Sequence, residues 1–137
     1  MIKQRFIVDK YYWKVYVYYD VTKNDVEVVL NKLKELRLPI SYIKSAYTIL
    51  NSNKQNQGIT QTNVNLRTTV IVISKTSSSS EFVNSFVHEI VHLTNHIALY
   101  YNLDLTKEDV CYLAGDIAQE MYKICHTLMC DYCREGL

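Results

Sequence analysis

Apolar and polar residues alternate along the first segment of the chain, Gln4 to Val21. A period of two is typical of a β-strand with one buried face. The polar pair Asp9-Lys10 falls inside the segment, so the pattern predicts either one long strand or two strands joined by a turn. The apolar positions that carry the alternation are Phe6, Val8, Trp13, Val15 and Val17.

Helical spacing replaces this alternation after Thr22. Thr22 to Asp25 is polar and typical of a helix start, and Pro39 ends the predicted helix. The Ile, Tyr and Thr content of Ile40 to Leu50 favours a third strand. A polar loop or turn is expected from Asn51 to Gly58. The apolar residues at helical spacing are Val26, Val29, Leu30, Leu33 and Leu36.

The second half of the chain begins with a continuous β-branched run, Thr69 to Ser74. Such a run predicts a central strand buried on both faces. Ser78 and Glu81 have the spacing of a capping box, which predicts a helix from about Glu81 to Tyr101. Its apolar stripe should pack on the sheet. The stripe consists of Phe82, Phe86, Ile90, Leu93 and Ile97.

A last helix is predicted to open at Thr106, which we expect to be its N-cap. Gly115 lies in the middle of this helix, a position that is tolerable if another helix approaches closely there. Together these elements predict an α+β fold: one domain, residues 1–137, with a small β-sheet packed by helices. The core stripe of the last helix is Val110, Leu113, Ile117, Met121, Ile124 and Leu128.

Composition narrows the classes of function. Apolar residues make up 48% of the 137 residues, as in globular proteins. The net charge of +1 gives no electrostatic argument for binding nucleic acid or an anionic membrane. No uninterrupted run of about 18 apolar residues occurs, and the first residues do not resemble a signal peptide. We therefore expect a protein of the cytoplasm (the host cytoplasm, if it is encoded by a phage).

All four cysteines lie near the end of the chain. In the cytoplasm they should stay reduced. Cys125, His126, Cys130 and Cys133 could form a second metal cluster. One short helix cannot wrap four ligands around one ion, so the favoured interpretation is that Cys125, Cys130 and Cys133 are small apolar fillers or terminal thiols.

The candidate chemistry lies in the helix predicted from Glu81 to Tyr101. His88-Glu89-Ile90-Val91-His92 is an HExxH motif. Residues four apart lie on one helix face, so His88 and His92 can bind one zinc ion. Glu89 can then take a proton from a zinc-activated water, as general base. The competing interpretation is two surface histidines on an amphipathic helix.

A catalytic zinc ion needs about three protein ligands. Glu108, at the start of the next helix, is the favoured third ligand, with Asp116 and Glu120 as alternatives. His96 repeats the four-residue step, but it lies about 12 Å from His88 along a straight helix and cannot share the ion. It is a candidate for an outer hydrogen-bond donor to the site or for a cleft residue.

The segments around His88-Glu89 and Glu108 resemble a group of small phage-encoded zincin-like proteins. In that group a strand and a short loop lead into HExxH, and the next helix carries an E-xxx-Y-L-x-G signature. The likeness covers roughly Thr69 to Tyr122. It implies a zincin-type zinc site, with Glu108 as the third ligand, as in the gluzincin peptidases.

In this resemblance Tyr112 and Gly115 match the Tyr and Gly of the signature, while Cys111 replaces an expected Ala without affecting a ligand. The Tyr112 hydroxyl could donate to a developing oxyanion, although a packed tyrosine is an equal explanation. The predicted function is a zinc-dependent metallopeptidase (a hydrolase) acting on a peptide or protein substrate. An extended substrate could pair with the Thr69–Ser74 strand if that strand lies at the cleft edge.

The alternative function is a catalytically inactive zinc-binding structural module, or a host-protein-binding module of phage origin. In the second case, the aromatic residues between Tyr11 and Tyr19 would be a candidate surface. Most such aromatics are ordinary strand residues.

Overall fold

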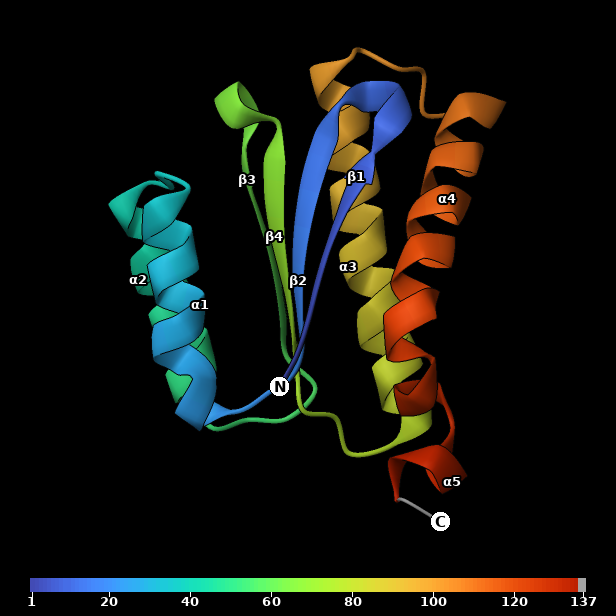
Figure 1. The fold of residues 1–137 in the computed structure, drawn as a ribbon. Helices are drawn as coiled ribbons and strands as arrows, with labels where there is room; N and C mark the ends of the chain where they lie inside the picture. Colours follow the sequence, from blue (N-terminus) through green and yellow to red (C-terminus); the bar gives the residue numbers. More distant parts are fainter. Residues whose placement is uncertain (136–137) are drawn as a thin grey trace.

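The computed structural model describes residues 1–135 and contains one four-stranded mixed sheet in the order β1-β2-β4-β3. Figure 1 shows this sheet standing between two pairs of helices. The strands are β1 (Ile2–Val8), β2 (Trp13–Val21), β3 (Gly58–Asn63) and β4 (Thr68–Ser74).

Two antiparallel hairpins build the sheet. β1 pairs with β2 across the short 3₁₀ turn η1 (Asp9–Tyr11), and β3 pairs with β4 across η3 (Val64–Leu66). The hairpins are joined by parallel pairing of β2 with β4. β3 is therefore an edge strand, and β4 is an inner one.

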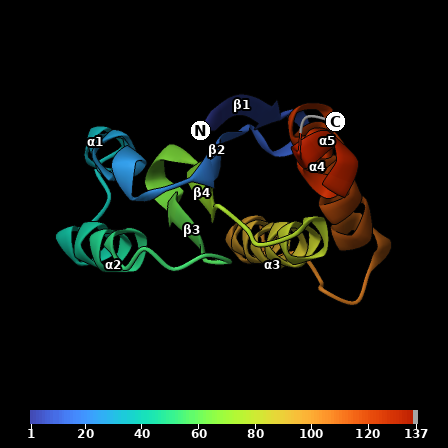
Figure 2. The same ribbon diagram turned by 90° about the horizontal axis from the view of Figure 1, so that it is seen from below.

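Helices cover both faces of the sheet. α1 (Val26–Glu35) and α2 (Ile40–Asn51) lie on one face, and α3 (Ser79–Tyr100) and α4 (Glu108–Cys125) lie on the other (Figures 1 and 2). Each face has its own apolar core. This arrangement confirms the predicted α+β fold class.

Four sequence predictions about the local structure are confirmed. β4 is buried at every position, as its β-branched run predicts. Asp9 and Lys10 lie in a turn between two strands. The apolar stripe of α3 is buried against the sheet from Phe82 to Ile97. Helix α3 begins where expected, because the Ser78 hydroxyl accepts a hydrogen bond from the Glu81 N–H at 3.1 Å.

The prediction of a strand from Ile40 to Leu50 is wrong, because this segment is helix α2. Pro39 lies at its N-cap rather than simply ending α1. Ala46 and Leu50, four residues apart, are buried on one helix face against the sheet. Packing at this spacing outweighs the weak β preference of Ile, Tyr and Thr.

Pairing of a substrate with the Thr69–Ser74 strand required that strand to lie at a cleft edge, and this condition is not met. β4 is flanked by β2 and β3, so its backbone groups are used inside the sheet. The edge strand beside α3 is β3, of which the sequence prediction covered only the first residue, Gly58, as the end of a polar loop. β3 is mostly polar and half-buried, so its sequence lacks the alternation of apolar and polar residues that predicts a strand.

The C-terminal segment folds back along α3. After α4 the chain forms η4 (His126–Met129) and α5 (Asp131–Arg134). The Asp131 carboxylate accepts a hydrogen bond from the Ser79 N–H, and the Arg134 guanidinium donates to the Thr76 carbonyl. The N-cap of α4 is Lys107, one residue later than predicted. Among residues 1–135, none of the helices has the length and apolar character needed to cross a membrane.

Leu93 tests the core beneath α3, because its side chain is fully buried there. We expect Leu93→Ala to lower the free energy of unfolding by about 2–5 kcal/mol, through lost burial and the cavity that remains. Leu105→Ala is the matched control at an exposed leucine and should change it by less than about 0.5 kcal/mol. Urea unfolding followed by circular dichroism measures both values. Equal effects of the two substitutions would contradict the packing described here.

Candidate metal centre

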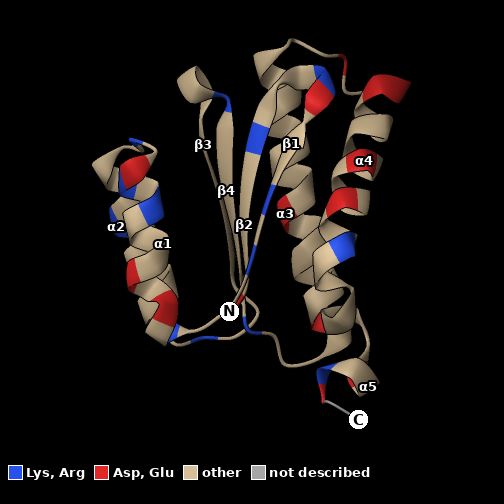
Figure 3. Cartoon of the chain, in the orientation of Figure 1, with Lys and Arg blue, Asp and Glu red and all other residues tan. Residues whose placement is uncertain are grey.

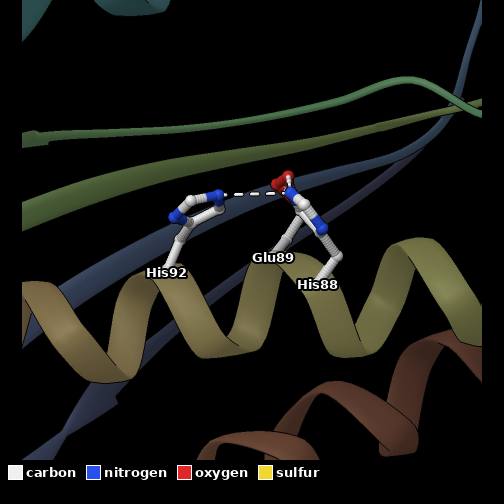
Figure 4. Close-up of side chains that lie close together, drawn as sticks. All are labelled: His88, Glu89 and His92. Carbon is white, nitrogen blue, oxygen red and sulfur yellow. Dashed lines mark hydrogen bonds and ion pairs between the residues drawn. The ribbon is translucent and has the colours of Figure 1, made fainter.

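Helix α3 presents His88, Glu89 and His92 toward the sheet side of the helix. Figure 4 shows the three side chains leaving the helix on the side where the strands lie, while another helix runs on the opposite side. The apolar stripe fixes this direction, because Ile90 and Leu93 must face the core between α3 and the sheet. The motif residues consequently face the β3 edge.

The two histidines already have the separation that a shared ion requires. His88 Nε2 and His92 Nε2 lie 3.2 Å apart. Two nitrogen ligands of a tetrahedral zinc ion, each at about 2.0–2.1 Å, lie roughly 3.3 Å from each other. Potential ligand atoms of His88, Glu89 and His92 all lie within 4.8 Å of one another, so this group could hold a metal ion. Both imidazoles are exposed and accessible to an ion and to a substrate.

Glu89 differs from the histidines in being buried, with 2% of its surface exposed. Its carboxylate fits against β3: the Thr60 hydroxyl donates to Oε2 at 3.1 Å. Burial raises the pKa of Glu89, while the Thr60 hydrogen bond and the nearby His88 and His92 act in the opposite direction. Oε1 lies 3.9 Å from His88 Nε2. A partly desolvated carboxylate beside two potential metal ligands is suited to general-base chemistry.

Gly58 makes room for this carboxylate. A Cβ atom built at position 58 would lie 2.8 Å from both Cδ and Oε1 of Glu89. Real Cβ atoms do not come so close, so any larger residue would displace the Glu89 side chain. Sequence reasoning assigned Gly58 to a turn and missed both Gly58 and Thr60 as site residues.

The structure does not assemble the expected set of His88, His92 and Glu108. Among residues 1–135, the metal-compatible group contains only His88, Glu89 and His92. Glu108 begins α4, beyond the far end of α3 and the loop that follows it. From His92 to the last residue of α3 the helix axis alone covers about 12 Å.

The other candidates for a third ligand also lie elsewhere. Asp116 and Glu120 border a hollow beside the end of β1, and Glu120 pairs with Lys123 at 2.8 Å. Tyr112 is exposed on α4 and lies outside the group of side chains around Glu89.

His96 lies one helical turn beyond His92 and connects to the sheet through a chain of hydrogen bonds. His96 Nδ1 lies 2.8 Å from the Thr62 hydroxyl, which lies 2.6 Å from that of Thr69. The Trp13 Nε1–H donates to Thr69 Oγ1 at 2.8 Å. Burial, followed by the nearby His92, lowers the pKa of His96. His96 is thus a half-buried, anchored side chain beside the metal-compatible group.

The cysteines do not form a second cluster in the described part of the chain. Cys125 is buried in the core against the sheet, whereas Cys130 and Cys133 are exposed. Burial raises the pKa of the Cys125 thiol to about 11. The burial of Cys125 agrees with its interpretation as an apolar filler, while the role of Cys130 and Cys133 stays a prediction.

No protein-family model matches this chain, and neither a curated protein nor a solved structure matches it. The resemblance to phage-encoded zincin-like proteins stays a prediction that rests on the motif residues.

Two glycines give a matched test of the Glu89 position. Gly58 begins strand β3 and contacts Glu89, whereas Gly115 lies in the middle of helix α4. Gly58→Ala should lower the free energy of unfolding by about 1–3 kcal/mol, because the new methyl group meets the buried carboxylate. Gly115→Ala should raise it by up to about 1 kcal/mol, since nothing lies within 4 Å of the added Cβ and Ala favours a helix.

Urea unfolding of both variants measures this difference. A stabilising Gly58→Ala substitution would show that β3 does not hold Glu89 as described. The open space at Gly115 also removes the expected reason for a glycine there, which was the close approach of another helix.

Proposed function

We propose that this protein is a zinc-dependent hydrolase that cleaves peptide bonds, with His88 and His92 as zinc ligands and Glu89 as general base. The observation that carries the proposal is the 3.2 Å separation of the two imidazole nitrogens beside one buried carboxylate. A hydrogen bond between the two rings gives the same separation, so the buried Glu89 carboxylate beside them is what supports a joint role.

The donor set fits zinc. Neutral imidazole nitrogen is a common zinc ligand, and two such ligands leave coordination positions open to water and substrate. A bound zinc ion supplies Lewis-acid activation, which lowers the pKa of water toward ~7. The exposure of His88 and His92 leaves room for a substrate above the pair.

Glu89 supplies the proton transfer. Its Oε1 faces the histidine pair at 3.9 Å from His88 Nε2, and its Oε2 is held by the Thr60 hydroxyl. The free oxygen can accept a proton from the attacking water and pass it to the leaving amine. The Thr60 hydrogen bond and the Gly58 contact restrict the carboxylate to this position, which lowers the entropic cost of the transfer.

A second candidate is a metal-binding module without turnover. Its support is that Glu89 itself belongs to the group of three potential ligands. If the carboxylate coordinates the ion, it cannot act as the proton acceptor. Such a module would keep its structural or host-protein-binding role without hydrolysis.

Histidine substitutions test the metal site. We expect about one zinc ion per purified chain, and loss of that ion in His88→Ala and in His92→Ala, because one remaining imidazole binds weakly. His126→Ala is the matched control at an exposed histidine outside the group and should keep the ion. Elemental analysis after dialysis gives the stoichiometry. Zinc retained in both motif variants would contradict the site.

Glu89→Gln separates the two candidate functions. If Glu89 is the general base, the variant keeps its zinc and loses at least about 100-fold in the rate of peptide cleavage. If Glu89 is a ligand, zinc affinity falls as well. Mass spectrometry of digested peptides and elemental analysis give both readouts.

Glu108→Ala belongs in the same experiment, because the sequence favours Glu108 as a ligand and the fold places it elsewhere. We expect this variant to keep its zinc. Loss of zinc from it would restore Glu108 as the third ligand and require α4 to rearrange.

A further inference from the structure

A cavity of about 660 Å³ adjoins the metal-compatible group, between α2, the edge strand β3 and α3. Its volume falls within the range of small-ligand sites, which is about 300–1,000 Å³. It lies on the His96 side of the motif. It is lined by Tyr42, Ser45, Thr60, Gln61, Thr62, Val64, His96, Leu99 and Tyr100.

The lining contains no Asp, Glu, Lys or Arg. Strand β3 carries none of these residues, and α3 carries only Glu81 and Glu89 (Figure 3). A charged group that entered the cavity would lose water without gaining a partner of opposite charge. Exposed apolar or aromatic side chains surround the space, as is typical of interaction sites. These are Tyr42, Val64, Leu99 and Tyr100.

The backbone of β3 faces this space with unused hydrogen-bonding groups. The Ser74 N–H donates to the Gln57 carbonyl at 2.9 Å, and antiparallel pairing alternates from there. The N–H and C=O groups of Gly58, Thr60 and Thr62 therefore point away from β4. Within residues 1–135 these groups have no backbone partner outside the sheet. An extended peptide could add to this edge as a further strand.

Polar groups within the cavity suit a peptide rather than a hydrocarbon. The Trp13 N–H donates to the Thr69 hydroxyl, and the Thr62 hydroxyl lies within hydrogen-bond distance of both the Thr69 hydroxyl and His96 Nδ1. The Gln61 Oε1 atom is a buried acceptor without a partner in the described residues. A peptide backbone carries both donors and acceptors, which suits this polar, uncharged lining.

We infer that β3 and this cavity bind an extended peptide that adds to the β3 edge and places a bulky, uncharged side chain between α2 and α3. The inference deepens the proposed function, because it defines the substrate class of the same site. Thr60 both lines the cavity and contacts Glu89, so the cavity begins beside the reacting groups and extends to Thr62, about 7 Å further along the strand. The preferred side chain should therefore lie within about three residues of the cleaved bond.

Fluorescence anisotropy tests the binding separately from cleavage. The full-length protein carries Glu89→Gln, which blocks the proposed hydrolysis, and the probe is a labelled peptide of about eight residues, long enough to cover β3. Its central residue is phenylalanine, and companion peptides carry glutamate or lysine there. We expect each charged peptide to bind at least about tenfold more weakly. A phenylalanine peptide N-methylated at alternate residues should bind as weakly, because it cannot pair with the edge.

Two leucine variants locate the bound side chain. Leu99→Lys, at the cavity, should weaken binding of the phenylalanine peptide at least about fivefold. Leu105→Lys is the matched control at an exposed leucine outside the cavity and should stay within about twofold.

The inference is overturned if the phenylalanine peptide does not bind, if the charged peptides bind equally well, or if the two leucine variants behave alike. Wild-type protein incubated with the same peptides, followed by mass spectrometry, reports on the proposed function separately. Selective binding without cleavage would support the inference and refute the hydrolase. Cleavage at the same rate whatever the central residue would support the hydrolase and contradict the inference.

Discussion

The rotation of α3 about its own axis is the constraint on which the candidate site depends. The apolar stripe from Phe82 to Ile97 buries one face of the helix against the sheet. With that face fixed, the helical repeat leaves no freedom in the direction of His88, Glu89 and His92. They face the β3 edge because Ile90 and Leu93 face the core. A helix rotated by one residue would bury a histidine and expose an apolar side chain.

The position of β3 then divides the motif into a buried and an exposed part. Gly58 and Thr60 come so close to α3 that Glu89 is enclosed, while His88 and His92 stay accessible. Enclosure raises the pKa of the carboxylate, and the Thr60 hydroxyl fixes its orientation. The same contact keeps the edge of β3 beside the reacting groups. The strand thus contributes to the geometry of the site without supplying a metal ligand.

The sheet also connects the candidate metal centre to the cavity beside His96. The chain of hydrogen bonds from Trp13 through Thr69 and Thr62 to His96 ties the helix to β2, β4 and β3. The contact between His96 Nδ1 and the Thr62 hydroxyl anchors the His96 ring to the sheet. The histidine pair, the edge strand and the cavity therefore share one rigid support.

The sequence by itself determined the local elements with strong periodicity. It gave β4 from its β-branched run, the start of α3 from Ser78, and the spacing that places His88 and His92 on one face. These features depend on residues close together in the chain. The α+β class followed from the same patterns.

Tertiary packing decided the rest. The segment from Ile40 to Asn51 became a helix because Ala46 and Leu50 pack on the sheet. Strand β3 formed from polar residues because β4 offered a partner. The environment of Glu89 depends on Gly58 and Thr60, about thirty residues earlier, and no local pattern encodes that contact. For the same reason, Glu108 was predicted to lie near the histidines from its spacing in the sequence. In the structure, the direction in which α3 faces separates Glu108 from the histidine pair.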